Sequence, residues 1–190
     1  MLDIYTTTYA WDGANYLFPG DYSIQGIIYN KTLFEKNGWK MPHNFKELKE
    51  LIPKIEEAGV QPSITMLSLP GYGFQYFCNV SSAMFLATKS GQKWIEDFQT
   101  GKADAETGLA DCAKYFQQWI DCGLLNGDSD AFAINECRNK FYEGNTAFLI
   151  GSMDRLTQNE DGSGDQYGLI PYLSPDGTEN MYITSVRKYY

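Results

Sequence analysis

Residues 141–152, FYEGNTAFLIGS, limit the possible folds of this chain more than any other stretch. An aromatic pair ends a predicted helix, Gly144 stops it, and a short apolar run follows that breaks at Gly151-Ser152. Glycine commonly ends helices, and a short apolar run between turn residues is typical of a buried strand. Open α/β sheets hold small ligands beyond the ends of their strands. The stretch therefore predicts a strand whose last residues border a binding site.

Apolar spacing predicts helices and strands that alternate irregularly along the chain, which indicates the α/β class. The clearest helix covers 44–59, where Asn44 can cap the first turn together with Glu47 and Gly59 can end the helix. Further helices are predicted at 75–89, 92–99, 106–122 and 130–142, and strands at 22–30, 60–68, 146–151, 166–172 and 181–186.

Three of the predicted helices have a recognisable apolar face. In the helix over 44–59 we expect one buried stripe of Phe45, Leu48, Ile52 and Ile55. In the helix over 106–122 we expect the buried side chains to be Leu109, Ala113, Phe116 and Ile120. In the helix over 130–142 we expect Ile134, Cys137 and Phe141 to point inward, with Ser129 as its cap.

The composition argues against nucleic acid and anionic membranes as partners. The 190 residues carry a formal net charge of −9, and no basic stripe offsets it. No apolar run approaches the roughly 20 residues of a membrane helix. The first residues, MLDIYTTTYAWDG, lack a basic start and an apolar block, so we expect a processed or fragmentary chain. The 14 tyrosines suit a binding surface for polar, ring-bearing ligands.

Metal and cofactor sites are not predicted. The cysteines are Cys78, Cys112, Cys122 and Cys137, and their spacing fits neither a zinc site nor a redox motif. We expect buried thiols, although the sequence leaves a disulfide open. The loop Asp161-x-Ser163-x-Asp165 begins like a calcium loop but then departs from that pattern.

Catalysis is not predicted either. The only histidine, His43, has no serine or cysteine motif beside it, and no phosphate-loop or dinucleotide fingerprint is present. We therefore expect a protein that is not an enzyme and needs no cofactor.

A second motif carries a family resemblance. Residues 29–34 read Tyr-Asn-Lys-Thr-Leu-Phe, and a glycine, a proline and a capped helix follow them. With NKFYEGNTAFLIGSM, YGLIPYLSPDG and MYITSVRKYY in the same order, the chain resembles extracellular solute-binding proteins of ABC transporters. The resemblance is to family 1, the sugar-binding type that includes maltose-binding protein, over roughly residues 20–188.

This resemblance implies one lobe of a type II periplasmic-binding-protein-like fold, with a mixed central sheet flanked by helices. Residues 1–190 would form a single C-terminal lobe, with 1–20 and 181–190 near the hinge crossings and the N-terminal lobe missing. Such a protein would capture a sugar or oligosaccharide and deliver it to the permease subunits of an ABC importer. It would act in the periplasm or on the extracellular face of the cell envelope, lipid-anchored in the parent. The alternatives are a carbohydrate-active enzyme, a carbohydrate-binding module or a structural interaction domain.

The resemblance also places the ligand contacts in loops at one edge of the sheet. At the entry to the first hinge strand it implies Asp21, Tyr22 and Ser23, for which a capped turn is the alternative. In the loop LPGYGFQYF it implies a stacking aromatic, best matched by Tyr72 with Phe74 as its neighbour. Tyr76 and Phe77 in the same stretch are expected to be core.

Beyond Gly151-Ser152, the family usually places a tryptophan where this chain has Met153, so the expected stacking platform is absent. Asp154 and Arg155 could hydrogen-bond a solute, or could form a surface ion pair. On the return strand the resemblance implies Tyr182 and Thr184 near the hinge. Trp11 is a further candidate for the cleft.

Overall fold

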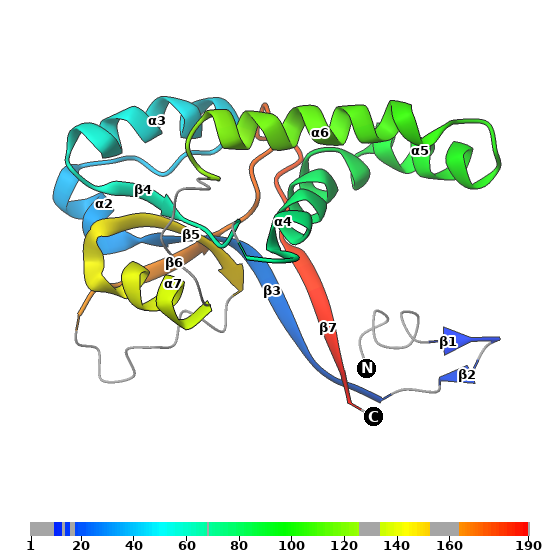
Figure 1. Ribbon diagram of the computed structural model, residues 1–190, viewed down its shortest axis with the longest axis horizontal. Coiled ribbons are helices and arrows are strands. Elements are labelled where there is room, and N and C mark those ends of the chain that lie inside the picture. Colours follow the sequence, from blue (N-terminus) through cyan, green and yellow to red (C-terminus); the bar gives the residue numbers. More distant parts are fainter. Residues whose placement is uncertain are drawn as a thin grey trace.

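The computed structural model describes residues 10–12, 14–15, 18–67, 69–125, 134–152 and 164–189 (Figure 1). The strands are β1 (Ala10–Trp11), β2 (Ala14–Asn15), β3 (Phe18–Asn30), β4 (Gln61–Ile64), β5 (Thr146–Ser152), β6 (Tyr167–Ile170) and β7 (Ile183–Tyr189). The helices are α2 (Lys31–Asn37), α3 (Phe45–Glu57), α4 (Tyr72–Ser81), α5 (Lys89–Gln99), α6 (Ala105–Asp121) and α7 (Ile134–Lys140). Short π-helical turns follow α4 at Ser82–Leu86 and α7 at Phe141–Asn145.

A mixed sheet forms the centre of the fold, with strands in the order β4-β5-β3-β6. β4 runs parallel to β5, whereas β5 and β6 are both antiparallel to β3. Ile27, Ile28, Phe148 and Leu149 on the two central strands are all buried, because the sheet is covered on both faces. In Figure 1, α3 and α6 run along one side of the sheet and α7 lies on the other. The expected α/β fold with a mixed sheet flanked by helices is confirmed.

β3 is unusually long and belongs to two pairings. Residues 25–30 pair with β5 and β6 inside the sheet, while residues 18–25 pair with β7. These outer residues of β3 and β7 form a two-stranded ribbon that extends away from the helices (Figure 1). We call it the β3–β7 ribbon, residues 18–25 and 183–189.

The predicted start of α3 is confirmed. The Asn44 side chain accepts a hydrogen bond from the Glu47 backbone N–H at 2.8 Å. The Glu47 carboxylate in turn accepts from the His43 backbone N–H at 2.8 Å. The side chains buried along α3 are Phe45, Leu48, Leu51, Ile52 and Ile55. Four of these, all except Leu51, form the buried stripe that helical spacing predicts.

The predicted buried face of α6 is confirmed at Phe116, which is half-buried against the core, and is wrong at Leu109, Ala113 and Ile120, which are exposed. Leu109 is 47% exposed and Ile120 is 37% exposed, whereas Gly108, Cys112 and Trp119 are buried. The helix is rotated because the Trp94 ring of α5 lies directly over Gly108, and Trp119 fills the core between Phe45 and Tyr172. Glycine contributes nothing to an apolar pattern, so the sequence conceals this contact.

The predicted inward face of α7 is confirmed for Cys137 and Phe141, both fully buried. Ser129 and the Ile134 side chain lie outside what the structure describes. Cys112, Cys122 and Cys137 are buried and Cys78 is half-buried, and none of the four forms a disulfide. In the described part of the chain, no helix is long and apolar enough to cross a membrane.

Candidate functional site

The strand FLIGS ends at a small cavity. β4 and β5 are parallel, so their C-terminal ends lie at one edge of the sheet. Ile150, Gly151 and Ser152 end β5, Met66 follows β4, and Gln25 of β3 pairs with Ser152. This is the edge at which the sequence pattern predicts a ligand.

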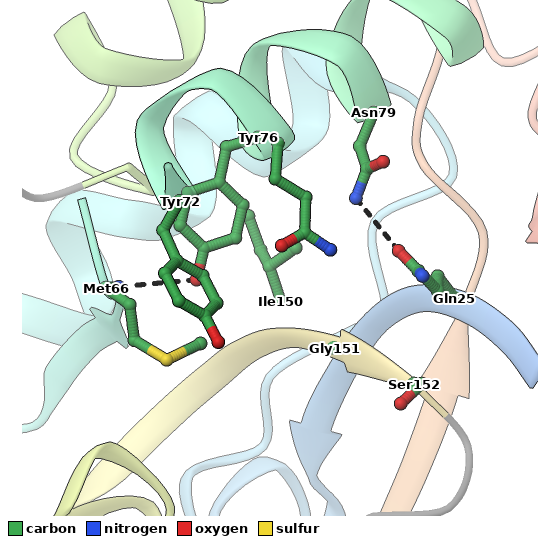
Figure 2. A pocket seen from close by; sticks show the side chains of 9 residues that line it. Gln25, Met66, Tyr72, Tyr76, Asn79, Ile150, Gly151 and Ser152 are labelled. Atoms are coloured by element: carbon green, nitrogen blue, oxygen red, sulfur yellow. Dashed lines mark hydrogen bonds between the residues drawn. The ribbon is translucent and has the colours of Figure 1, made fainter. Parts of the chain in front are cut away.

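The cavity has a volume of about 110 Å³. Its lining consists of Gln25, Met66, Tyr72, Gln75, Tyr76, Asn79, Ile150, Gly151 and Ser152 (Figure 2). Four of these residues come from α4, which forms one wall above the end of β5.

The wall follows from helical geometry. Tyr72, Gln75, Tyr76 and Asn79 are spaced i, i+3, i+4 and i+7, so they share one face of α4. α4 begins three residues earlier than predicted, because Gly71 adopts a φ of 85° and turns the chain into the helix. This left-handed conformation favours glycine.

The aromatic side of the cavity is formed by two tyrosines. The rings of Tyr72 and Tyr76 lie 6.5 Å apart at 52°. Tyr76 is buried, and its hydroxyl accepts a hydrogen bond from the Met66 backbone N–H at 3.3 Å (Figure 2). Tyr72 is only half-buried, so part of its ring stays available to a ligand.

The polar side is held by amides. Asn79 Nδ2 donates to Gln25 Oε1 at 2.9 Å and to the Tyr172 hydroxyl at 3.2 Å. Tyr172 is fully buried, and burial raises the pKa of its hydroxyl well above the ordinary value, so it stays neutral. The two amides are thereby fixed in orientation. None of the described residues lining the cavity is an Asp, Glu, His, Lys or Arg.

Of the residues expected to touch a ligand, the structure brings Tyr72 to the cavity. Phe74 is 72% exposed and lies about 200° around α4 from Tyr72, so it does not line this cavity. Met153, Asp154 and Arg155 fall outside the described residues. Their roles, and that of Phe74, stay predictions.

Of the expected contacts on the β3 strand of the β3–β7 ribbon, only the Ser23 side chain is described, and it does not line the cavity. Ser23 is buried, and its Oγ has no hydrogen bond to the described residues. Asp21 and Tyr22 pair with Arg187 and Val186 through their backbones, and their side chains are not described.

On the return strand, the Tyr182 hydroxyl donates to the Leu169 carbonyl at 3.2 Å. A Cβ at Gly26 would lie 3.2 Å from the Tyr182 ring. Since strand residues alternate between faces, Tyr182 is on the face of β3 opposite Gln25. Thr184 is exposed on the ribbon, and the Trp11 side chain is not described.

Sequence reasoning missed most of the cavity. Gln25, Met66, Gln75 and Asn79 were not singled out, and Tyr76, which is buried as expected, also lines the cavity. The one available signal was the spacing of residues 72, 75, 76 and 79, which becomes visible only when the helix is started at Gly71.

Metal binding finds no support in the described residues, among which no cluster of three or more His, Cys, Asp or Glu occurs. Asp165 of the calcium-like loop instead accepts a hydrogen bond from Asn30 Nδ2 at 2.6 Å. Asp161 and Ser163 lie outside the described residues.

The profile of one protein family, described as bacterial extracellular solute-binding protein, matches residues 2–188. The chain belongs to this family. Its fold is that of a lobe of such proteins, and the resemblance seen in the sequence is confirmed.

Curated relatives of this solute-binding protein are longer. Proteins of Brucella abortus (strain 2308) and Brucella suis biovar 1 (strain 1330), both named as binding proteins, are each 27% identical to it over 185 residues. The match covers 90% of this chain and 41% of each relative, so the chain spans less than half their length.

Solved structures agree on the fold. A chain from work on xylan utilization by Caldanaerobius polysaccharolyticus has a TM-score of 0.77 and 21% identity, with 98% of this chain and 49% of that chain covered. A sugar transporter protein from Bacillus licheniformis, solved with stachyose, has a TM-score of 0.76 and 19% identity, and the match covers 98% of this chain and 50% of that chain. A family 1 extracellular solute-binding protein from Bifidobacterium longum subsp. infantis has a TM-score of 0.72 and 18% identity, and the match covers 98% of this chain and 48% of that chain.

Proposed function

We propose that this chain is the solute-capture lobe of a sugar-binding protein that serves an ABC importer. The observation that carries the proposal is the chemistry of the cavity at the end of β5. Its described lining combines tyrosine rings with uncharged amide and hydroxyl groups at the edge of the sheet where β4 and β5 end.

That chemistry fits a neutral, polyhydroxylated solute. Each sugar hydroxyl both donates and accepts hydrogen bonds, and the amides of Gln25, Gln75 and Asn79 offer both kinds of group. The half-buried Tyr72 ring offers a flat apolar face to the C–H side of a sugar ring. A charged solute would need a counter-charge that the described lining lacks. The Bacillus licheniformis structure, whose title names stachyose, supports the same class.

The size of the cavity favours a second lobe. Ligand pockets usually enclose about 300–1,000 Å³, which is several times more than the 110 Å³ found here. We propose that residues 1–190 form one lobe, the C-terminal one, and that a partner lobe supplies the opposite wall and closes over the solute. The solved relatives, twice as long as this chain, support that arrangement. The β3–β7 ribbon, with residues 1–20 and 181–190, would carry the chain between lobes.

The proposed delivery to an importer implies further partners at the membrane. The family is extracellular, so the loaded protein would dock on the permease subunits of an ABC transporter at the outer face of the membrane. The parent would be lipid-anchored there or held in the periplasm.

A carbohydrate-active enzyme or a carbohydrate-binding module is the alternative. A glycosidase needs two carboxyl groups on either side of the scissile bond. The described lining of the cavity contains no carboxylate, so the described residues offer binding groups without the acid and base of a glycosidase. We propose that the protein is not catalytic.

Calorimetry of the complete two-lobe protein tests the proposed function. The panel contains stachyose, raffinose, xylotetraose and chitotetraose, with tri- and tetrapeptides as the competing class. We expect saturable heat with at least one saccharide, no heat with peptides, and unchanged saccharide after prolonged incubation. Heat with peptides alone, or cleavage of a bound saccharide, would overturn the proposal.

A further inference from the structure

Gln25 occupies the branch point of β3. It is the last residue paired with β7, opposite Ile183, and the first paired with β5, opposite Ser152. Its side chain also lines the cavity (Figure 2). One residue thus belongs to the sheet, to the β3–β7 ribbon and to the candidate binding site.

Asn79 connects Gln25 to the other strand of the ribbon. Its two N–H groups donate to Gln25 Oε1 and to the Tyr172 hydroxyl. Tyr172 exchanges two backbone hydrogen bonds with Met181, at 2.9 and 3.1 Å. β7 begins two residues after Met181, so Asn79 is joined directly to β3 and, through Tyr172 and Met181, to the segment that leads into β7.

The amide of Asn79 has one group left for a solute. No described residue donates to its Oδ1, and Asn79 lines the cavity. A hydroxyl that donates to Oδ1 polarises the amide and strengthens the two bonds donated by Nδ2, because linked hydrogen bonds reinforce one another.

We propose that Asn79 is a coupling residue through which an occupied cavity stabilises the β3–β7 ribbon, by way of Gln25 on β3 and of Tyr172, whose backbone pairs with Met181 just before β7. This inference rests on the proposed function and extends it, since it assigns the link between solute capture and the strands that would join two lobes. A single side chain is enough for the link because Asn79 lines the cavity and bonds both to β3 and to the residue that pairs just ahead of β7.

Tyr172→Phe isolates this link. The substitution removes the hydroxyl that accepts from Asn79 and keeps the ring that packs on Trp119. Tyr172 is not part of the cavity lining, and Asn79 keeps its hydrogen bond to Gln25, so every group that can contact the solute stays in the lining. Tyr167→Phe is the matched control, since Tyr167 lies on β6 and packs on Phe141 and Tyr142, away from the cavity.

The readout is hydrogen–deuterium exchange of the ribbon with and without saturating saccharide. The probe is whichever of stachyose, raffinose, xylotetraose or chitotetraose binds the complete wild-type protein in calorimetry. In wild type and Tyr167→Phe we expect the saccharide to slow exchange across residues 18–25 and 183–189. In Tyr172→Phe we expect the saccharide-induced slowing to fall about two- to tenfold, the range set by one neutral hydrogen bond, with affinity within about threefold.

Three results are decisive. If Tyr172 is merely structural, Tyr172→Phe speeds exchange of the ribbon equally with and without saccharide, and the slowing caused by saccharide is unchanged. That result overturns the coupling and leaves the proposed solute capture standing. If Tyr172→Phe does not fold, Gln25→Met at saturating saccharide takes its place, and an unchanged ribbon response there overturns the coupling too. If the wild-type protein binds no saccharide, the proposed function fails and the coupling fails with it.

Discussion

At the residue scale, the candidate site is made by side chains whose types are unremarkable in a sequence. Glutamine and asparagine occur throughout any soluble protein, so nothing marked Gln25 or Asn79 before the fold placed them together. Tyr72 could be predicted because the family resemblance implies a stacking aromatic in that loop. Phe74, its neighbour in the same loop, was an equally aromatic candidate, and the helical turn that begins after Gly71 places the two side chains on different faces of α4.

Tyr72 and Phe74 make a matched pair of test sites. Tyr72→Ala removes a ring from the cavity wall, so we expect saccharide binding to weaken about tenfold, or by ~1.4 kcal/mol. Phe74→Ala changes a side chain that is 72% exposed on the other face of α4, so we expect less than a twofold change. Calorimetry of the complete protein measures both. Equal losses for the two variants would contradict the assignment of the wall.

Tyr167 predicts how stability depends on pH. Burial, with the nearby Asp165 carboxylate and Tyr142, raises the pKa of Tyr167 to about 12 from its ordinary 10.0. Because the folded state holds this proton more tightly, the contribution to stability is complete below pH 10 and is lost as the pH rises to about 12. The free energy of unfolding, measured by chemical denaturation between pH 10 and 12, should show this decline. In Tyr167→Phe the free energy should fall less steeply with pH. An identical slope in the variant would rule out Tyr167 as a source.

At the element scale, sequence patterns located the helices better than they oriented them. The cap at Asn44 and the stripe of α3 were predicted because both signals are local. The face of α6 was not predicted because it is set by a ring from α5. Leu109 and Ile120 match helical spacing as well as Cys112 and Trp119 do, and only tertiary packing decides between these faces.

Gly108 tests that packing. A Cβ at this position would lie 2.0 Å from the Trp94 ring. A Gly→Ala substitution inside a helix normally raises the free energy of unfolding by up to about 1 kcal/mol, but overpacking of the core lowers it by about 1–3 kcal/mol. We therefore expect Gly108→Ala to lower the free energy of unfolding by about 1–2 kcal/mol in urea denaturation. Ala110→Gly, at an exposed position of the same helix, calibrates the propensity effect alone. A more stable Gly108→Ala protein would show that the ring does not constrain α6.

Asn44 tests the cap of α3. Its side chain accepts from the Glu47 N–H and also donates to the Glu47 carboxylate at 3.0 Å. Asn44→Ala should cost about 1 kcal/mol of unfolding free energy, while Asn44→Ser should retain most of it because serine also caps well. Thermal denaturation distinguishes the two. Equal losses in both variants would mean that the cap does not contribute.

At the scale of the whole molecule, the fold class and the family could be predicted from sequence, because motifs in the right order report the topology. The edge of the sheet that holds the cavity was also predicted, from the break at Gly151-Ser152 after a buried strand. The composition of the cavity could not be predicted. It gathers residues 25, 66, 72, 75, 76, 79 and 150–152, which only the pairing of β3 with β5 and the packing of α4 bring together.

The most direct test of the central claim is to locate a bound saccharide by the side-chain amide signals of the complete protein in NMR. During titration with the saccharide that binds in calorimetry, the NH2 signals of Gln25, Gln75 and Asn79 should shift with one saturation curve. Those of Asn37 and Asn180, which donate to the backbone of Leu33 and His43 away from the cavity, should stay in place. Saturable binding that shifts the distant amides and leaves the three cavity amides unchanged would contradict the account.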